Sequence, residues 1–156
     1  MAFFNKKDGF FLLIPAASAA GLAVALVAQY VFGLHPCELC QWQRVPYVLA
    51  ILTGIIFRRK KRREIFLIYF LLMAVESALA FYHLAVEKGY VSSGCSDSGG
   101  GAANAKEMLD KIMAAPVVSC NQPQFEFLHL SMAGWNGIYA LCLAAAAIIL
   151  FKNAAR

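Results

Sequence analysis

Three long apolar runs dominate the hydrophobic pattern of the chain, at residues 10–34, 65–84 and 128–151. A helix needs about 20 mostly apolar residues to cross the roughly 30 Å of bilayer hydrocarbon, and each run meets this length. A fourth run, 45–57, is too short by itself, so a complete crossing that ends at residue 57 has to begin near Glu38. We therefore place the second span at about 39–57 and expect four transmembrane helices.

The first apolar run continues well past the small-residue stretch "AASAA" that could suggest a cleavage site. It is too long for the hydrophobic region of a secretory signal peptide. We interpret it as an uncleaved first span. The pattern predicts an all-α membrane protein, a four-helix bundle in a single domain over residues 1–156.

Composition agrees with this pattern, since 61% of the residues are hydrophobic, 15% are charged, and the mean hydropathy is +0.63. Most of the 14 Lys and Arg residues lie before the first span, in the run "RRKKRR" at 58–63, or after the fourth span. The positive-inside rule then places both termini and the basic run in the cytoplasm. This topological explanation makes a nucleic-acid partner unnecessary, and we expect none.

The outer loops are then residues 35–38 and 85–127. Within the longer loop, "SSGCSDSGGGAANA" is rich in Gly and Ser and is typical of a flexible segment. The following "AKEMLDKIMAAP" has apolar residues on one helical face and charged residues mostly on the other, which predicts a short amphipathic helix at the membrane interface.

Four of the five cysteines fall in the outer loops: Cys37, Cys40, Cys95 and Cys120. Disulfides persist on the outer side of a cell membrane and are rare in the cytosol. Cys142 lies inside a span, where a free cysteine behaves as a small hydrophobic residue.

The Cys37–Cys40 motif has several interpretations. Haem attachment requires His directly after the second cysteine, and Gln41 stands there. A structural zinc site uses paired, closely spaced ligands, which Cys95 and Cys120 do not provide, so we expect no metal. Two purely structural disulfides remain an alternative, although a Cys-x-x-Cys at a helix start is common redox geometry.

Arg44 follows Cys40 by four residues, which places both side chains on one face of the second span. The helix dipole and the guanidinium would both stabilise a Cys40 thiolate. Snorkelling of Arg44 to lipid headgroups is the alternative. A charge at the membrane edge beside a redox-type motif favours a functional role.

At this point the chain resembles the DsbB family, the bacterial disulfide bond formation proteins B. The resemblance rests on "CELCQWQR" opening the second span, a cysteine pair in the second outer loop, and "FLHLSMAGWN" leading into the fourth span. It implies a thiol oxidase of the bacterial inner membrane with periplasmic redox cysteines. Such an enzyme takes electrons from a DsbA-like thioredoxin-fold protein and passes them to ubiquinone or menaquinone.

The resemblance also implies roles for residues of this chain. The partner is expected to attack a Cys95–Cys120 disulfide at Cys95, and the released Cys120 then attacks Cys37. This frees Cys40 as the thiolate that faces the quinone.

For the quinone site the resemblance implies Arg44 and His83, and Met132 is a further candidate for the wall of the quinone pocket. An ordinary interfacial histidine is the alternative for His83. Gln43 stands where such families often carry an acidic or other polar residue, and Glu76 lies in mid-span, where it should be neutral or paired; neither has a predicted role. The competing function is a four-span transporter or assembly factor with structural disulfides.

Overall fold

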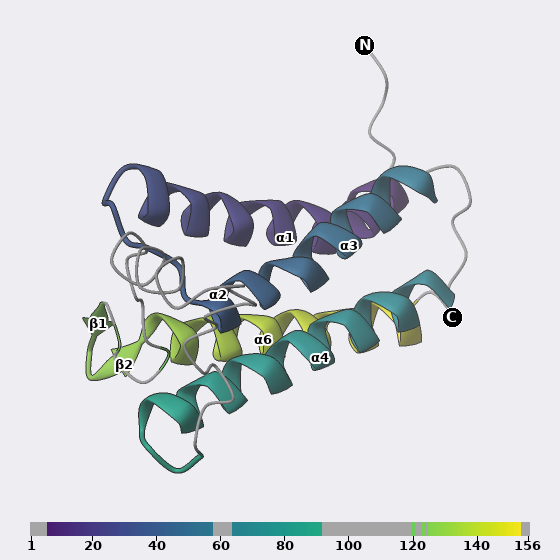
Figure 1. The fold of residues 1–156 in the computed structure, drawn as a ribbon. Coiled ribbons are helices and arrows are strands. Elements are labelled where there is room, and N and C mark those ends of the chain that lie inside the picture. The colour runs from purple at the N-terminus through teal and green to yellow at the C-terminus, as the bar shows by residue number, and fades with distance from the viewer. Residues whose placement is uncertain (1–5, 58–63, 92–119, 121–122, 124, 154–156) are drawn as a thin grey trace, which may run out of the picture.

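The structure, a computed structural model, describes residues 6–57, 64–91, 120, 123 and 125–153. The helices and strands in this part of the chain are α1 (Lys6–Tyr30), α2 (Glu38–Trp42), α3 (Arg44–Ile56), α4 (Glu64–Glu87), β1 (Glu126–Phe127), β2 (Leu130–Ser131) and α6 (Met132–Asn153) (Figure 1). The predicted interfacial helix and Cys95 lie outside the described residues. The protein is mostly helical, as predicted.

Three of the described helices are long and apolar enough to cross a membrane, with candidate spans Phe11–Tyr30, Glu64–Glu87 and Met132–Asn153. The predicted second span corresponds to α2 and α3 together. Helix α3 has only 13 residues, which is fewer than the roughly 20 that a perpendicular crossing needs. A fourth crossing therefore stays a prediction.

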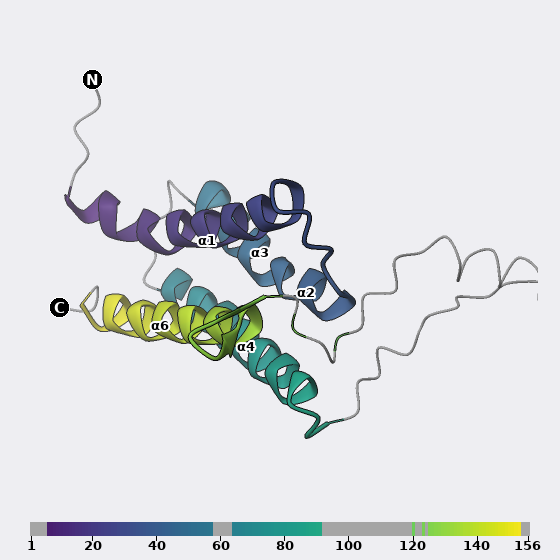
Figure 2. The same cartoon turned by 90° about the vertical axis from the view of Figure 1, so that its left-hand side faces the viewer.

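The helices form two pairs, because α4 packs most extensively on α6 and α1 packs on α3. Figures 1 and 2 show these pairs lying against each other, with the start of α1 and the end of α6 at the same end of the bundle. Helix α2 and the two short strands lie at the opposite end. We refer to these as the terminal end and the α2 end.

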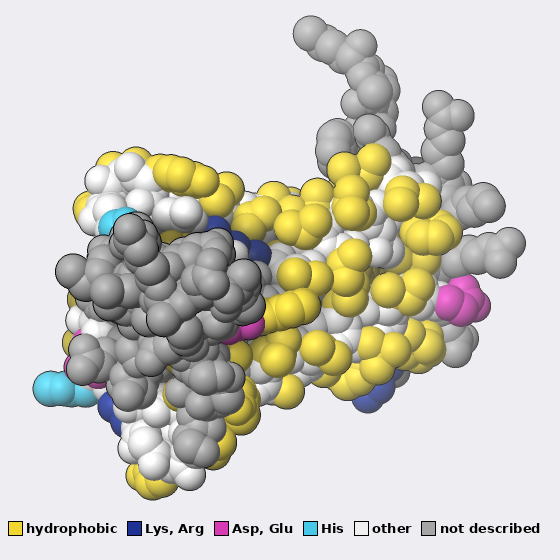
Figure 3. Space-filling view, in the orientation of Figure 1, with side chains coloured by type: hydrophobic (Ala, Val, Ile, Leu, Met, Phe, Trp, Pro, Cys, Tyr) yellow, Lys and Arg dark blue, Asp and Glu magenta, His cyan; other side chains and the backbone are white. Residues whose placement is uncertain are grey.

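The outer surface is apolar between the two ends, as Figure 3 shows for one face. Large aliphatic side chains such as Ile55, Leu71 and Ile149 are more than half exposed. In water such a surface would be a liability, whereas lipid tails are as apolar as these side chains. The surface therefore fits the membrane setting.

Aromatic side chains fill the core at the terminal end. Phe11 of α1 contacts Phe66 and Tyr69 of α4 with ring centroids 6.2 Å apart in both pairs, a separation typical of tilted and edge-to-face aromatic pairs. Nearby, α1 and α3 approach closely because Gly54 has no side chain. A Cβ atom at Gly54 would lie 2.5 Å from Pro15 Cγ.

The start of α6 differs from the expected span. The sequence predicts helix from residue 128, but the structure has a β-hairpin in which Phe127 pairs with Leu130, and the helix begins at Met132. Leu128 and His129 form the turn with φ values of 54° and 61°, the left-handed conformation that a two-residue hairpin turn of this kind needs. Apolar residues in this hairpin extended the hydrophobic run and concealed the turn.

Trp135 of α6 secures the hairpin, because its Nε1–H donates to the carbonyl oxygen of Phe127 at 3.1 Å. Leu130 lies directly over Gly134, where an added Cβ would come within 2.6 Å of Leu130 Cγ. The hairpin thus packs on the first turn of α6.

Candidate functional site

A cavity of about 420 Å³ opens at the α2 end of the bundle. Its walls come from α1, α2, α3, α4 and α6. They include all the candidate site residues except Cys95 and Cys120: Cys37, Cys40, Arg44, His83 and Met132. Residues more than 90 positions apart in the sequence therefore meet around one space.

The cysteine pair forms one wall of this cavity. Cys37 is the N-cap residue of α2, and its Sγ accepts a hydrogen bond from the backbone N–H of Cys40 at 3.4 Å. The Cys37 thiol also donates to Cys40 Sγ at 3.1 Å. Cys37 is buried and Cys40 is partly exposed. The two sulfur atoms are held together, with Cys40 the more accessible.

These contacts move the two thiol pKa values in opposite directions. The hydrogen bond to Cys40 and then burial raise the pKa of Cys37 to about 12. The pKa of Cys40 is lowered, first because it accepts the hydrogen bond from the Cys37 thiol, although burial opposes the change. Cys40 is therefore the member of the pair that ionises first, and its thiolate is the reactive form.

The sequence attributed the ionisation of Cys40 to the helix dipole and Arg44. In the structure α2 is only five residues long, so its dipole is small, and the hydrogen bond from Cys37 comes first among the causes.

Cys120 lies close to this pair although the adjacent loop is not described. It is buried in one cluster with Cys37 and Val86, and Leu39 and Cys40 pack against that cluster. Three of the four predicted redox cysteines are thus close together.

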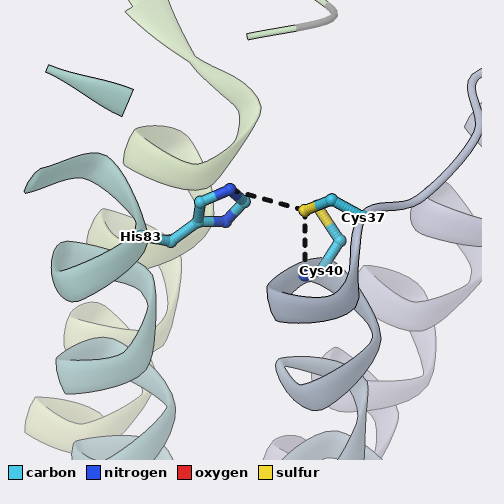
Figure 4. Close-up of side chains that lie close together, drawn as sticks. All are labelled: Cys37, Cys40 and His83. Atoms are coloured by element: carbon cyan, nitrogen blue, oxygen red, sulfur yellow. Dashed lines mark hydrogen bonds between the residues drawn. The ribbon is translucent and has the colours of Figure 1, made fainter. Parts of the chain in front are cut away.

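His83 faces the pair from α4, as Figure 4 shows. Its Nε2 lies 3.6 Å from Cys37 Sγ and also 3.6 Å from Glu87 Oε1. Its Nδ1 lies 3.1 Å from Gln43 Nε2. The imidazole is buried, with 3% of its surface exposed. It is therefore enclosed between the cysteine pair, Gln43 and Glu87.

Arg44 also lines the cavity. Its Nη1 donates to Gln29 Oε1 of α1 at 2.7 Å. The sequence predicted one continuous helix through Cys40 and Arg44, but the structure interrupts it at Gln43. Pro46 has no N–H to donate to the carbonyl four residues earlier, which accounts for a break at this point. The sulfur atoms and the guanidinium therefore border the same cavity from two helices.

Polar side chains that sequence reasoning left without a role connect this site to the bundle interior. Asn136 of α6 donates from Nδ2 to Gln43 Oε1 at 3.1 Å and to Glu76 Oε1 at 2.6 Å. Tyr47 donates its hydroxyl proton to Asn136 Oδ1 at 2.7 Å. Polar residues inside apolar spans are rare and usually functional, and this signal could have identified Asn136 as it did Glu76.

The sulfur atoms of Cys37 and Cys40 and a ring nitrogen of His83 all lie within 4.8 Å of one another. They could supply three of the four ligands of a tetrahedral zinc ion. Within the described residues no fourth His, Cys, Asp or Glu joins them at that spacing. Thiol–disulfide exchange needs no metal and therefore no fourth ligand, so the same three groups also suit that reaction.

The helical membrane fold and the paired thiols beside an apolar cavity define the class as membrane-embedded thiol oxidoreductases. The sequence model of "Disulfide bond formation protein DsbB" matches residues 7–150. The chain therefore belongs to the DsbB family, whose members are disulfide bond formation proteins of membranes and are generally linked to quinones.

Two relatives are similar to the chain, and one of them is a named disulfide bond formation protein. The chain is 31% identical to "Uncharacterized protein RP370" of Rickettsia prowazekii (strain Madrid E), covering 88% of this chain and 86% of the relative. It is 27% identical to "Disulfide bond formation protein B" of Polaromonas sp. (strain JS666 / ATCC BAA-500), covering 92% and 90%. Both similarities extend over nearly the whole chain.

Proposed function

We propose that this protein reoxidises a periplasmic DsbA-like dithiol protein and passes the electrons to ubiquinone or menaquinone, which sustains disulfide bond formation. The observation that carries the proposal is the Cys37–Cys40 pair, which lines the apolar cavity on one side and packs near Cys120 on the other. Such a pair can exchange with a second disulfide and also face a ligand in the cavity.

Thiol exchange begins at the second cysteine pair. The partner's thiolate attacks Cys95 of a Cys95–Cys120 disulfide, a new bond forms to Cys95, and Cys120 leaves as a thiolate. Cys120 then attacks Cys37 of a Cys37–Cys40 disulfide, so that a Cys120–Cys37 bond forms, the Cys37–Cys40 bond breaks, and Cys40 leaves with the electron pair. The burial of Cys120 beside Cys37 supports this order.

The cavity suits a quinone ring in size and chemistry. Its volume of about 420 Å³ falls within the range of ligand sites, about 300–1,000 Å³. Its α1 wall is formed mainly by small and aliphatic residues, among them Ala20, Leu22, Val24 and Ala25. A bound quinone would accept two electrons and two protons.

Polar and flexible side chains complete the quinone site. Arg44 has several N–H donors and uses one on Gln29, so others can orient a quinone carbonyl oxygen. Met132 supplies a flexible apolar wall. His83 lines the same cavity near the sulfur atoms.

We further propose that the protein lies in the bacterial inner membrane with four crossings, both termini cytoplasmic and the redox cysteines periplasmic. The distribution of Lys and Arg supports this orientation, as does the position of α2 at the end of the bundle opposite the start of α1. Single engineered cysteines should react with a membrane-impermeant reagent at position 99 and not at position 60. Outside labelling at position 60 would contradict the orientation.

Membranes that contain this protein should reduce a quinone when a reduced thioredoxin-fold dithiol protein is added. The quinone absorbance follows the reaction directly. Membranes with Cys40→Ser serve as the matched control. Equal rates in the two preparations would contradict the proposal.

The exchange order has its own test. Cys120→Ser should accumulate a mixed disulfide between the partner and Cys95, because the thiol that resolves it is missing. Retained activity without any adduct would favour a membrane protein with purely structural disulfides.

A further inference from the structure

A one-way chain of hydrogen bonds joins the middle of the bundle to the cysteine pair. It starts at the hydroxyl of Tyr47 and passes to Asn136 Oδ1, then from Asn136 Nδ2 to Gln43 Oε1, then from Gln43 Nε2 to His83 Nδ1. Each of the three contacts measures between 2.7 and 3.1 Å. Asn136 also donates to Glu76.

The direction of this chain follows from donor and acceptor chemistry. A tyrosine hydroxyl that donates to Asn136 fixes the amide with its oxygen toward Tyr47 and its nitrogen toward Gln43. The Asn136 nitrogen can only donate, so Gln43 must present its oxygen there and its nitrogen to His83. The Gln43 nitrogen is also only a donor, so His83 Nδ1 has to accept.

Glu76 reinforces this direction. Its Oε1 lies 2.6 Å from Asn136 Nδ2, and a carboxyl oxygen at this distance holds the amide nitrogen on its side. Glu76 is fully buried, and its Oε2 has no hydrogen-bond partner among the described residues. The hydrogen bond of Glu76 therefore goes to Asn136. This gives the acidic residue in mid-span a role, which is to hold the orientation of the Asn136 amide.

We propose that the chain from Glu76 and Tyr47 through Asn136 and Gln43 is a positioning device that fixes His83 as the Nε2–H tautomer and aims this N–H at the sulfur of Cys37. An imidazole with an accepting Nδ1 carries its proton on Nε2. Nε2 faces Cys37 Sγ at 3.6 Å, within reach of a hydrogen bond to sulfur. Glu87 and Cys37 are the ionisable groups that face this nitrogen.

The consequence for exchange rests on the proposed function. After Cys120 has bonded to Cys37, the partner's second thiol attacks its own sulfur in the mixed disulfide and releases Cys95 as a thiolate. Regeneration then requires Cys95 to attack Cys120, so that the Cys95–Cys120 bond forms and the Cys37–Cys120 bond breaks. Cys37 then leaves with the electron pair as a thiolate. Its S–H form is favoured by its surroundings, so a fixed N–H donor stabilises the unfavourable anion without transferring its own proton.

Nitrogen NMR of the reduced protein, with ¹⁵N-labelled histidine in lipid bilayers, tests the tautomer directly. The polypeptide has only three histidines, and the signal of His83 is identified because it disappears in His83→Asn. We expect wild-type His83 to show a protonated Nε2 and an unprotonated, hydrogen-bonded Nδ1. A protonated Nδ1 in the wild type would overturn the proposal.

Variants test whether the chain of hydrogen bonds sets this state. Gln43→Glu replaces the donor with an acceptor and should place a proton on Nδ1. Asn136→Leu leaves the Gln43 amide free to rotate and should give a mixture of tautomers, whereas Glu76→Gln keeps the acceptor oxygen and should keep the wild-type tautomer. Ser77→Ala is the matched control, because it removes a different hydrogen bond between α4 and α6, from Ser77 Oγ to Gly137 O.

An unchanged tautomer in both Gln43→Glu and Asn136→Leu would overturn the role of the chain, and so would an equal change in Ser77→Ala. Turnover separates this inference from the proposed function. In Gln43→Glu we expect slower turnover with reduced dithiol partner than in Ser77→Ala. If the wild type has the expected tautomer but reduces no quinone, the proposed function fails and the assignment at His83 stands.

Discussion

The two ends of the bundle are built on different principles. At the terminal end, Phe11, Phe66 and Tyr69 pack with aliphatic side chains from every long helix. At the α2 end, the cluster is small and contains Cys37, Cys120 and Val86, and polar contacts replace apolar packing around it.

This difference separates the packing that holds the helices together from the polar groups that we expect to perform the chemistry. Close packing of apolar side chains can be rearranged if volume is conserved. A buried hydrogen-bond network tolerates no such exchange, because every donor needs its acceptor. We therefore expect substitutions at the α2 end to change reactivity, and substitutions at the terminal end to change stability.

Cys40→Ser gives the largest expected effect. Because Cys40 supplies the more readily ionised thiol at the cavity, its loss should reduce dithiol-dependent quinone reduction to background while the thermal unfolding midpoint is retained. Cys142→Ser, in the exposed middle of α6, is the matched control and should keep wild-type turnover. An active Cys40→Ser protein would remove the functional distinction between the two ends.

Arg44→Met gives the next effect. A hydrogen bond from a charged group contributes about 1.5–3 kcal/mol, so the KM for quinone should rise about tenfold to hundredfold. Thiol exchange with the partner should continue. Arg44→Lys should recover only part of the loss, because lysine keeps the charge without the planar fork. Full recovery with lysine would indicate an arginine that interacts with lipid headgroups.

The paired pKa values of the cysteines give a pH test. A lowered pKa means that the Cys40 thiolate persists to lower pH than an ordinary thiol with its value of 9.0. Cys37→Ala removes the first cause of the lowering and leaves burial, which raises the pKa. The pH profile of iodoacetamide alkylation should therefore move to higher pH.

This alkylation experiment uses a protein in which the three cysteines outside the pair, Cys95, Cys120 and Cys142, are replaced by serine. In the reciprocal Cys40→Ala variant, the pKa of Cys37 should fall from about 12, because the hydrogen bond to Cys40 that raises it most is gone. Identical profiles with and without the neighbouring cysteine would mean that the two thiols do not interact.

Gly54→Leu tests the terminal end and should have the smallest effect on turnover. A side chain there meets Pro15 of α1, and overpacking typically costs about 1–3 kcal/mol. Unfolding in a denaturing detergent should show this loss, while Cys40 alkylation stays as in the wild type. The neighbouring Ile55→Ala, at a position that is 66% exposed, is the control and should unfold nearly as the wild type does. Altered Cys40 alkylation in Gly54→Leu would show that the two ends are coupled.

The sequence predicted the helical membrane fold and the family because span length and cysteine order are local features of the chain. It also named five of the residues that line the cavity, whose roles stay predictions. The break at Gln43 and the hairpin at 126–131 were not predicted, since both depend on backbone details within a hydrophobic run. The contacts of Asn136 were missed because they join helices that are distant in sequence.

The sulfur atom of Cys37 caps the start of helix α2, because it accepts a hydrogen bond from the backbone N–H of Cys40. None of its five residues is buried, although Leu39 and Cys40 pack against the cluster of Cys37, Cys120 and Val86. Each change in the bonding or charge of Cys37 alters the strength of that cap. The exchange of the Cys40 amide proton with deuterium should therefore vary with the redox state of the pair, giving a readout of the catalytic cycle that requires neither a chromophore nor a partner.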